Sequence, residues 1–163
     1  QTCALPIFIN EVLPVVRKKF PQIKMVVAGA NPSSEILKLN LDNVEVTGWV
    51  EDIREYFYQS KVMLAPMLIS IGLQNKILQA MAMKTPCIIS TLANNAIGAV
   101  NGREAIIADS AEEIAHAIAE LLNNELQRNQ LSEKAYAFVN KNYDWKNIAA
   151  DLNELITDNS IRF

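Results

Sequence analysis

Short, continuous apolar runs alternate with helical patterns along most of the chain. The runs that we interpret as strands are Met25–Gly29, Val44–Gly48, Val62–Pro66, Pro86–Ser90 and Ala105–Asp109. Apolar runs of this length, without alternating polar positions, are typical of parallel strands that are buried on both faces. The patterns around them predict helices at Asn10–Phe20, Ser33–Leu39, Asp52–Gln59, Leu73–Met83 and Ala111–Asn123. This alternation predicts an α/β fold, with a parallel sheet flanked by helices.

The C-terminal part of the chain has no further strand pattern. Two helices are predicted there, Leu126–Lys141 and Trp145–Ile156, with a break around Asn142–Asp144. Serine is a favourable N-cap residue, so Ser34 or Ser110 could cap its helix.

The segment Val62–Ser90 reads as strand, loop, helix, breaker and strand, which is one βαβ unit. Its polar residues gather at the start of the helix, where unpaired N–H groups and the positive end of the helix dipole favour an anion. Helical spacing places Gly72, Lys76 and Gln79 on one face, where Gly72 lets a ligand approach the backbone and Lys76 adds a charge. The other face should pack on the sheet through Ile77, Leu78 and Met81.

The composition limits the classes of partner. The net charge is −3 and the basic residues are scattered, so we expect no nucleic acid partner. No apolar run approaches the roughly 20 residues that span a bilayer. Cys3 and Cys87 indicate neither a disulfide nor a metal site, and we expect a reducing, cytoplasmic compartment. No catalytic triad or metal-spaced cluster is visible, so we expect no metal cofactor, and we expect His116 to be solvated.

The residues around the predicted βαβ helix resemble a family signature. Pro66, Gly72, Gln79–Ala82 and Thr85–Pro86 are similar to the motif of the retaining glycosyltransferases of family four. One subgroup carries Gly-x-Gln-Asn-Lys-x-Leu-Glu-Ala-Met-Ala-Met, and Gly72–Met83 follows this pattern except for a glutamine at the glutamate position. The resemblance covers the chain from about Phe8 onward and includes the segments Asn10–Phe20, Val26–Pro32, Val44–Val50 and Ala105–Asp109.

This resemblance implies a Rossmann-like fold, that of the C-terminal, donor-binding domain of a GT-B enzyme. Such enzymes have two domains, and 163 residues leave room for one of them. The implied partners are therefore a nucleotide-sugar donor and a missing N-terminal acceptor domain, to which the last helix crosses back. Peripheral contact with the inner face of a membrane stays open, through that missing domain.

The first seven residues depart from the family pattern. The family's second domain opens with a central strand that ends near an arginine and a lysine, and neither the strand nor the basic pair precedes Asn10. Gln1–Ile7 instead has the sequence that a widely used sequencing-library adapter encodes in frame. We therefore expect residues 1–7 to be non-native, and residues 8–163 to be a nucleotide-sugar-binding domain without its first strand. The alternative is a real, short N-terminal strand.

The resemblance also implies a set of donor contacts. The donor diphosphate is assigned to the start of the helix, at Gly72, Leu73, Gln74 and Lys76. The ribose is assigned to Gln79, and the donor sugar to the region of Ser70 and Ile71. The base is assigned to the turn after the second predicted strand, at Gly48, Trp49 and Val50.

Two of these positions lack the family's carboxylates. Gln79 replaces the glutamate that accepts hydrogen bonds from the ribose, and an amide oxygen is a weaker acceptor than a carboxylate. Gln79 could equally be a neutral surface residue. Ile71 replaces the glutamate that holds the donor sugar, which weakens the assignment of the sugar more than that of the fold.

Other candidate residues have ordinary structural interpretations beside the functional ones. Lys76 could be a solvated lysine, but a cation at a helix N-terminus opposes the dipole, which favours a nearby anion. Trp49 could stack on the base, although packing is the more common role for an aromatic residue after a strand. Asn31–Pro32 could line the cleft or form a turn, and Asn94–Asn95 could face phosphate.

We interpret the chain as the donor-binding half of a retaining glycosyltransferase of polysaccharide biosynthesis, inactive by itself. The full enzyme would transfer a hexosyl group from a nucleotide sugar to a saccharide or lipid-linked acceptor. The alternative is a non-catalytic nucleotide-sugar-binding or partner subunit, because carboxylates are absent at Ile71 and Gln79. A receiver-type signalling domain is disfavoured, since it needs clustered acids at strand ends, which here read Gly29, Gly48, Pro66 and Ser90.

Overall fold

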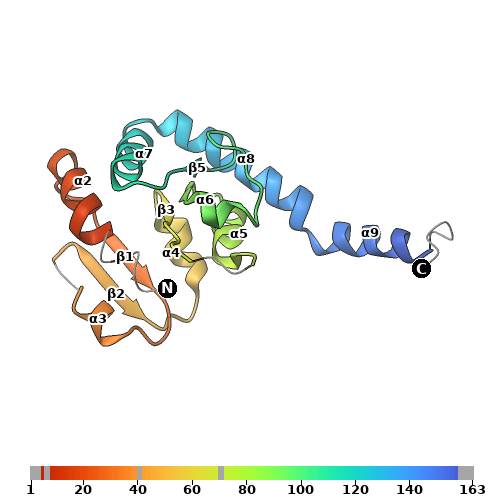
Figure 1. Cartoon of the computed structure of the whole chain (residues 1–163), viewed down its shortest axis with the longest axis horizontal. Helices are drawn as coiled ribbons and strands as arrows, with labels where there is room; N and C mark the ends of the chain where they lie inside the picture. The colour runs from red at the N-terminus through yellow and green to blue at the C-terminus, as the bar shows by residue number, and fades with distance from the viewer. Residues whose placement is uncertain (1–4, 6–7, 40–41, 70–71, 158–163) are drawn as a thin grey trace.

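Strands and helices alternate along the chain in the predicted order (Figure 1). The computed structural model describes residue 5 and residues 8–39, 42–69 and 72–157. The strands are β1 (Met25–Ala28), β2 (Val44–Gly48), β3 (Met63–Ala65), β4 (Cys87–Ile89) and β5 (Ile106–Ile107). The helices between them are η1 (Phe8–Val12), α2 (Leu13–Lys19), α3 (Ser34–Leu37), α4 (Ile53–Gln59), α5 (Asn75–Ala82), α6 (Thr91–Asn94) and α7 (Ala111–Asn123). Two C-terminal helices follow, α8 (Glu125–Tyr143) and α9 (Trp145–Thr157), so the predicted fold class is confirmed.

The strands form two parallel sheets. β1 pairs with β2, and β3, β4 and β5 pair in that order. Within the described ranges β1 and β3 each have one edge that pairs with no other strand. No described strand joins the two sheets. The expectation that residues 1–7 are non-native lies outside the described residues, apart from Leu5.

Alternate residues of the three-stranded sheet pack on opposite faces, as a period of two requires. Leu64 and Ile88 contact the cluster formed by η1, α2 and α7. Ala65 and Ile89 lie in the second cluster, with α5, α6 and α8. Val27 of β1 packs against the first cluster, so both sheets share one layer of helices.

The helix caps follow the sequence with one correction. Ser33, not Ser34, caps α3, because Ser33 has the extended backbone of an N-cap and its hydroxyl accepts from the Ile36 N–H at 3.4 Å. Ser110 caps α7 as predicted, in a capping box with Glu113. Backbone hydrogen bonds at Ser110 lower the pKa of Glu113 below its ordinary value. The short helix α6 was not predicted.

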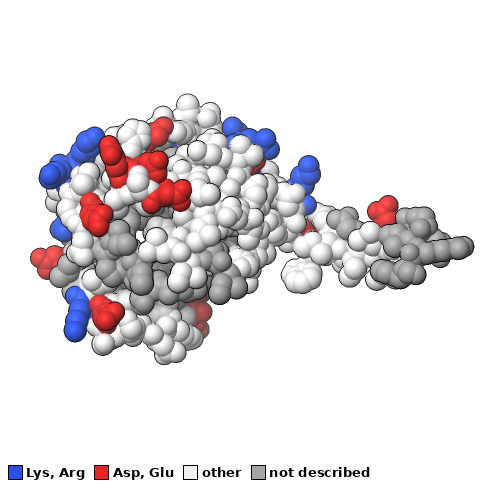
Figure 2. Space-filling view, viewed as in Figure 1, with Lys and Arg blue, Asp and Glu red and all other residues white. Residues whose placement is uncertain are grey.

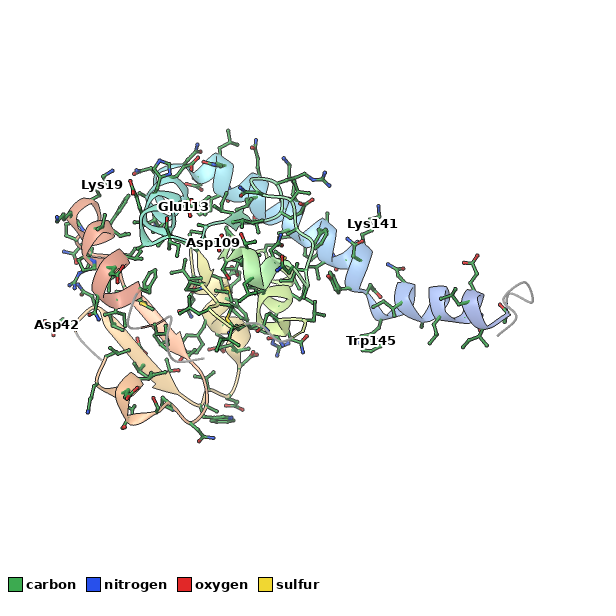
Figure 3. All side chains as sticks on the ribbon, in the orientation of Figure 1. Lys19, Asp42, Asp109, Glu113, Lys141 and Trp145 are labelled. Atoms are coloured by element: carbon green, nitrogen blue, oxygen red, sulfur yellow. The ribbon has the colours of Figure 1, made fainter. Side chains whose placement is uncertain are left out.

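The C-terminal helix α9 extends away from the rest of the molecule (Figure 1). Trp145, at its junction with α8, is 82% exposed (Figure 3). The other exposed apolar side chains of α9 are Ile148, Leu152, Leu155 and Ile156. No described helix is both long and apolar enough to cross a membrane.

Candidate functional site

The candidate site lies at the N-terminus of α5, which follows the carboxyl end of β3. Gly72, in the preceding loop, has φ +68, and a Cβ built on it would meet nothing within 4 Å. Only glycine adopts this backbone conformation readily, and the open space lets a ligand approach the main chain. Gln74 occupies the N-cap position, but its side chain does not cap the helix. The N–H groups of Ile77 and Leu78 donate to the Gln74 carbonyl at 2.9 and 3.5 Å, whereas those of the first two residues, Asn75 and Lys76, precede the first acceptor of the helix.

Lys76 stands in the first turn of α5, at the positive end of the helix dipole. Surrounding protein atoms remove part of its hydration, and this desolvation lowers the pKa of the Lys76 ammonium. Among the described residues no carboxylate forms an ion pair with it. Both effects disfavour a positive charge here, so an anionic ligand would relieve both.

The opposite face of α5 packs as the spacing predicts. Ile77, Ala80 and Met81 are fully buried in the second cluster, and Leu78 is half-buried against it. Gln79 is exposed. The division of α5 into a packing face and an open face is therefore confirmed, while the donor contacts assigned to the open face stay predictions.

A second open backbone position lies at the end of β2. Gly48 has φ +70 and an unobstructed Cβ direction, and its carbonyl accepts from the Gly29 N–H at 3.2 Å. Trp49 is 73% exposed, so the packing interpretation of this residue is wrong. Val50 is half-buried and leads to Asp52, which caps α4. The Gly48 turn thus presents an exposed indole beside a glycine whose Cβ direction is open.

The two turns occupy equivalent positions, each after the carboxyl end of a parallel strand, β2 and β3 respectively. Ligands of α/β proteins gather at these ends of the strands. The far ends of α4 and α5 are joined by the Thr85 hydroxyl, which donates to the Phe57 carbonyl at 2.9 Å. This contact fixes the two helices relative to each other at the edge opposite the candidate site.

Other predicted positions are separate from this site or not described. The Asn94 amide donates to the Ala99 carbonyl at 2.9 Å and accepts from the Ala99 N–H at 3.0 Å, so it closes its own loop and the phosphate interpretation is not supported. Asn31 has φ 51, as expected for a turn. Ser70 and Ile71 lie outside the described residues.

Two contacts that order the neighbouring loops were not predicted. Asp109, at the end of the β5 segment, accepts from the Thr91 N–H at 2.8 Å and from its hydroxyl at 2.6 Å. Ser90 makes hydrogen bonds to Met67, at the start of the loop that leads to α5. A serine directly after a buried strand is a possible N-cap signal, but the following helix is too short to give a periodic pattern.

Charged side chains do not gather into a metal site. Acidic residues cluster over α7, where Figure 3 labels Glu113, and basic ones lie apart from them (Figure 2). Over the described ranges no group of three or more His, Cys, Asp or Glu residues could hold a metal ion. His116 lies on the surface and is 4.0 Å from Glu120.

Residues 2–124 match the model of a family described as "Glycosyl transferases group 1". The chain belongs to the group 1 glycosyltransferases. It is similar to a Klebsiella pneumoniae protein named "Uncharacterized 44.6 kDa protein in cps region", with 25% identity over 154 residues. The match covers 89% of this chain and 40% of the Klebsiella protein.

Solved structures show the same fold. The chain is similar to the C-terminal domain of LpcC, a group 1 family glycosyltransferase from Francisella tularensis, with a TM-score of 0.73 and 21% identity. The match covers 88% of this chain and 81% of that domain. The chain is also similar to Anabaena HepE in complex with UDP-glucose, with a TM-score of 0.72, 15% identity, and coverage of 90% of the chain and 45% of HepE. The chain thus spans less than half of HepE and of the Klebsiella protein, and it corresponds to the C-terminal domain of a GT-B enzyme.

Proposed function

We propose that this domain binds the nucleotide-sugar donor of a two-domain, retaining glycosyltransferase. The observation that carries the proposal is the N-terminus of α5, where the positive end of the helix dipole, the open Gly72 backbone and a Lys76 ammonium without an ion pair among the described residues meet. Each of these favours an anion, and a nucleoside diphosphate is the anion that HepE, a protein of the same fold, holds as UDP-glucose.

The base, the ribose and the donor sugar are assigned to residues near the carboxyl ends of β2 and β3 and on α5. The exposed Trp49 indole, beside the open Gly48 backbone, suits a nucleotide base. Gln79 lies three residues after Lys76 on the exposed face of α5 and is proposed to accept from the ribose hydroxyls. The donor sugar would then lie near Ser70 and Ile71.

The chemistry supplied by this domain is electrostatic. In sugar transfer the bond between the anomeric carbon and the diphosphate oxygen breaks, and its electron pair stays on the departing diphosphate. The N–H groups around Gly72–Gln74 and the Lys76 ammonium would stabilise that developing charge. Activation of the acceptor, a saccharide or a lipid-linked saccharide, is assigned to the other domain.

The proposed partner for α9 is that acceptor domain. The exposed apolar side chains of α9 have no cover among the described residues, and the matches cover only 40% of the Klebsiella protein and 45% of HepE. The name of the Klebsiella relative, a protein in the cps region, supports a role in polysaccharide biosynthesis. A cytoplasmic location, at the inner face of the membrane if the acceptor is lipid-linked, fits this role.

A non-catalytic, nucleotide-sugar-binding subunit is the second candidate. It is favoured by Gln79, which places a neutral amide where a carboxylate would bind the ribose more strongly. Transfer activity of the full-length protein discriminates between the two, because the non-catalytic subunit would bind UDP without turnover.

Calorimetry of the isolated chain with a panel of nucleoside diphosphates tests the proposal. We expect weak binding of at least one diphosphate, and no sugar transfer, because half of the cleft belongs to the other domain. Absence of binding across the panel would contradict donor recognition. Turnover by this chain alone would contradict the two-domain assignment.

A further inference from the structure

The Ser90 side chain joins the ends of two neighbouring strands. It is 5% exposed and directly follows β4. Its hydroxyl accepts from the Met67 N–H at 3.1 Å and donates to the Met67 carbonyl at 3.0 Å. The same oxygen caps α6 by accepting from the Ala93 N–H at 3.3 Å. One buried hydroxyl therefore fixes three backbone groups.

These hydrogen bonds continue the contact between the two strand segments beyond the last backbone pair. The Ser90 N–H donates to the Ala65 carbonyl at 3.2 Å, one position beyond the last β3–β4 pair. Alternate residues of β3 donate to β4, beginning with Met63, whose N–H donates to the Pro86 carbonyl at 2.8 Å, so the next donor in phase beyond β3 is Met67. The Met67 N–H instead donates to the Ala65 carbonyl at 2.9 Å and to the Ser90 hydroxyl. The hydroxyl of Ser90 takes over at Met67, so the chain stays attached to the sheet beyond the end of β3.

We propose that Ser90 is a positioning residue for the donor site. Met67 is where the chain leaves β3 toward Gly72 and the N-terminus of α5, so the hydroxyl at Ser90 sets the starting point of that loop. The inference rests on the proposed function, because it assumes that the α5 N-terminus binds the donor diphosphate. The Ser90 side chain is buried, and its hydroxyl contacts the Met67 backbone.

The expected effect is a loss of affinity that a loss of stability alone would not cause. Without the hydroxyl, the Met67 carbonyl loses its hydrogen bond, and arrangements in which Met67 is displaced from the end of β4 become comparable in energy. Apparent affinity falls in proportion to the fraction of molecules with the competent loop. When the two arrangements are comparable in energy, about half of the molecules keep the competent one, so S90A should bind UDP about twofold more weakly than the wild type.

The test compares four proteins by UDP calorimetry and thermal unfolding: the wild type, S90A, S90T and T85V. S90T keeps a hydroxyl at the same carbon and should restore most of the affinity. T85V is the matched control, because Thr85 is 2% exposed and its hydroxyl makes one partly buried hydrogen bond, to the Phe57 carbonyl, at the opposite end of β4. T85V should lower the melting temperature as much as S90A does and leave UDP affinity unchanged.

The outcomes separate the two proposals. No UDP binding by the wild type would overturn the proposed function, and this inference with it. UDP binding by the wild type and equal binding by S90A would overturn the positioning role alone. Equal weakening in S90A and T85V would also overturn it, because general destabilisation would then explain both. If S90A does not fold, S90C keeps the side-chain size with a weaker hydrogen-bonding group, and wild-type affinity in S90C would overturn the inference.

Discussion

Replacing Lys76 with alanine should weaken binding of a nucleoside diphosphate without unfolding the domain. A hydrogen bond to a charged group contributes about 1.5–3 kcal/mol. This corresponds to a roughly 10- to 150-fold increase in the dissociation constant of UDP. The ammonium makes no ion pair among the described residues, so its loss should remove the ligand contact and leave no protein carboxylate uncompensated.

K76A should raise the stability of the folded domain slightly or leave it unchanged, although it weakens UDP binding. Lys76 places a cation at the positive end of the α5 dipole, an arrangement that costs about 0.3–1 kcal/mol at exposed sites. The lowered pKa of Lys76 leads to the same conclusion, because desolvation disfavours the charged ammonium in the folded protein. K76A should therefore melt at or slightly above the wild-type temperature while it binds UDP less well.

The assay is UDP calorimetry at two salt concentrations, with K84A as the control. Lys84 lies just beyond the other end of α5 and pairs with Glu133 at 2.7 Å on an exposed surface, so K84A removes the same charge far from the candidate site. Added salt should weaken wild-type binding more than K76A binding. Equal affinities of K76A and the wild type would refute the reasoning, as would an equal loss in K84A.

The remaining predictions concern the ribose contact, the core and the sheet edges. Q79E should bind UDP as well as the wild type or a few-fold better, because a carboxylate is a stronger acceptor for ribose hydroxyls than an amide; clearly weaker binding by calorimetry would remove Gln79 from the ribose site. Cys87 should resist iodoacetamide at pH 8.5 until the domain unfolds, because burial raises the pKa of its thiol to about 12. Peptide mapping distinguishes Cys87 from Cys3, and rapid labelling of Cys87 in the folded protein would contradict its burial. Extension of the chain with the upstream sequence of its own gene should raise both the melting temperature and the solubility, because β1 and β3 each have an edge without a described partner. Cooperative unfolding after deletion of residues 1–7 would instead show that those residues are structural.

The local elements of the fold could be predicted because each has its own periodic signal. The apolar run around β2 and the amphipathic pattern of α7 give the observed bounds, Val44–Gly48 and Ala111–Asn123. Capping chemistry also predicted Ser110, whose partner Glu113 is three residues away. Helix α6 has four residues, about one turn, and so shows no periodicity by which it could be recognised.

The site was harder to predict because its supporting contacts join distant parts of the sequence. Ser90 and Met67 are 23 residues apart, and their contact depends on the pairing of β3 with β4. The exposure of Trp49 likewise depends on which elements cover the end of β2, and no local pattern reports this. The open face of α5 could be predicted, because helical spacing separates Lys76 from the buried Ile77 and Met81.

The most direct test of the central claim is a crystal structure of the full-length protein with UDP. The account predicts the diphosphate oxygens within hydrogen-bonding distance of the backbone N–H groups between Gly72 and Lys76, and one of them within reach of the Lys76 ammonium. A diphosphate bound away from the start of α5, with Lys76 still facing solvent, would contradict the account.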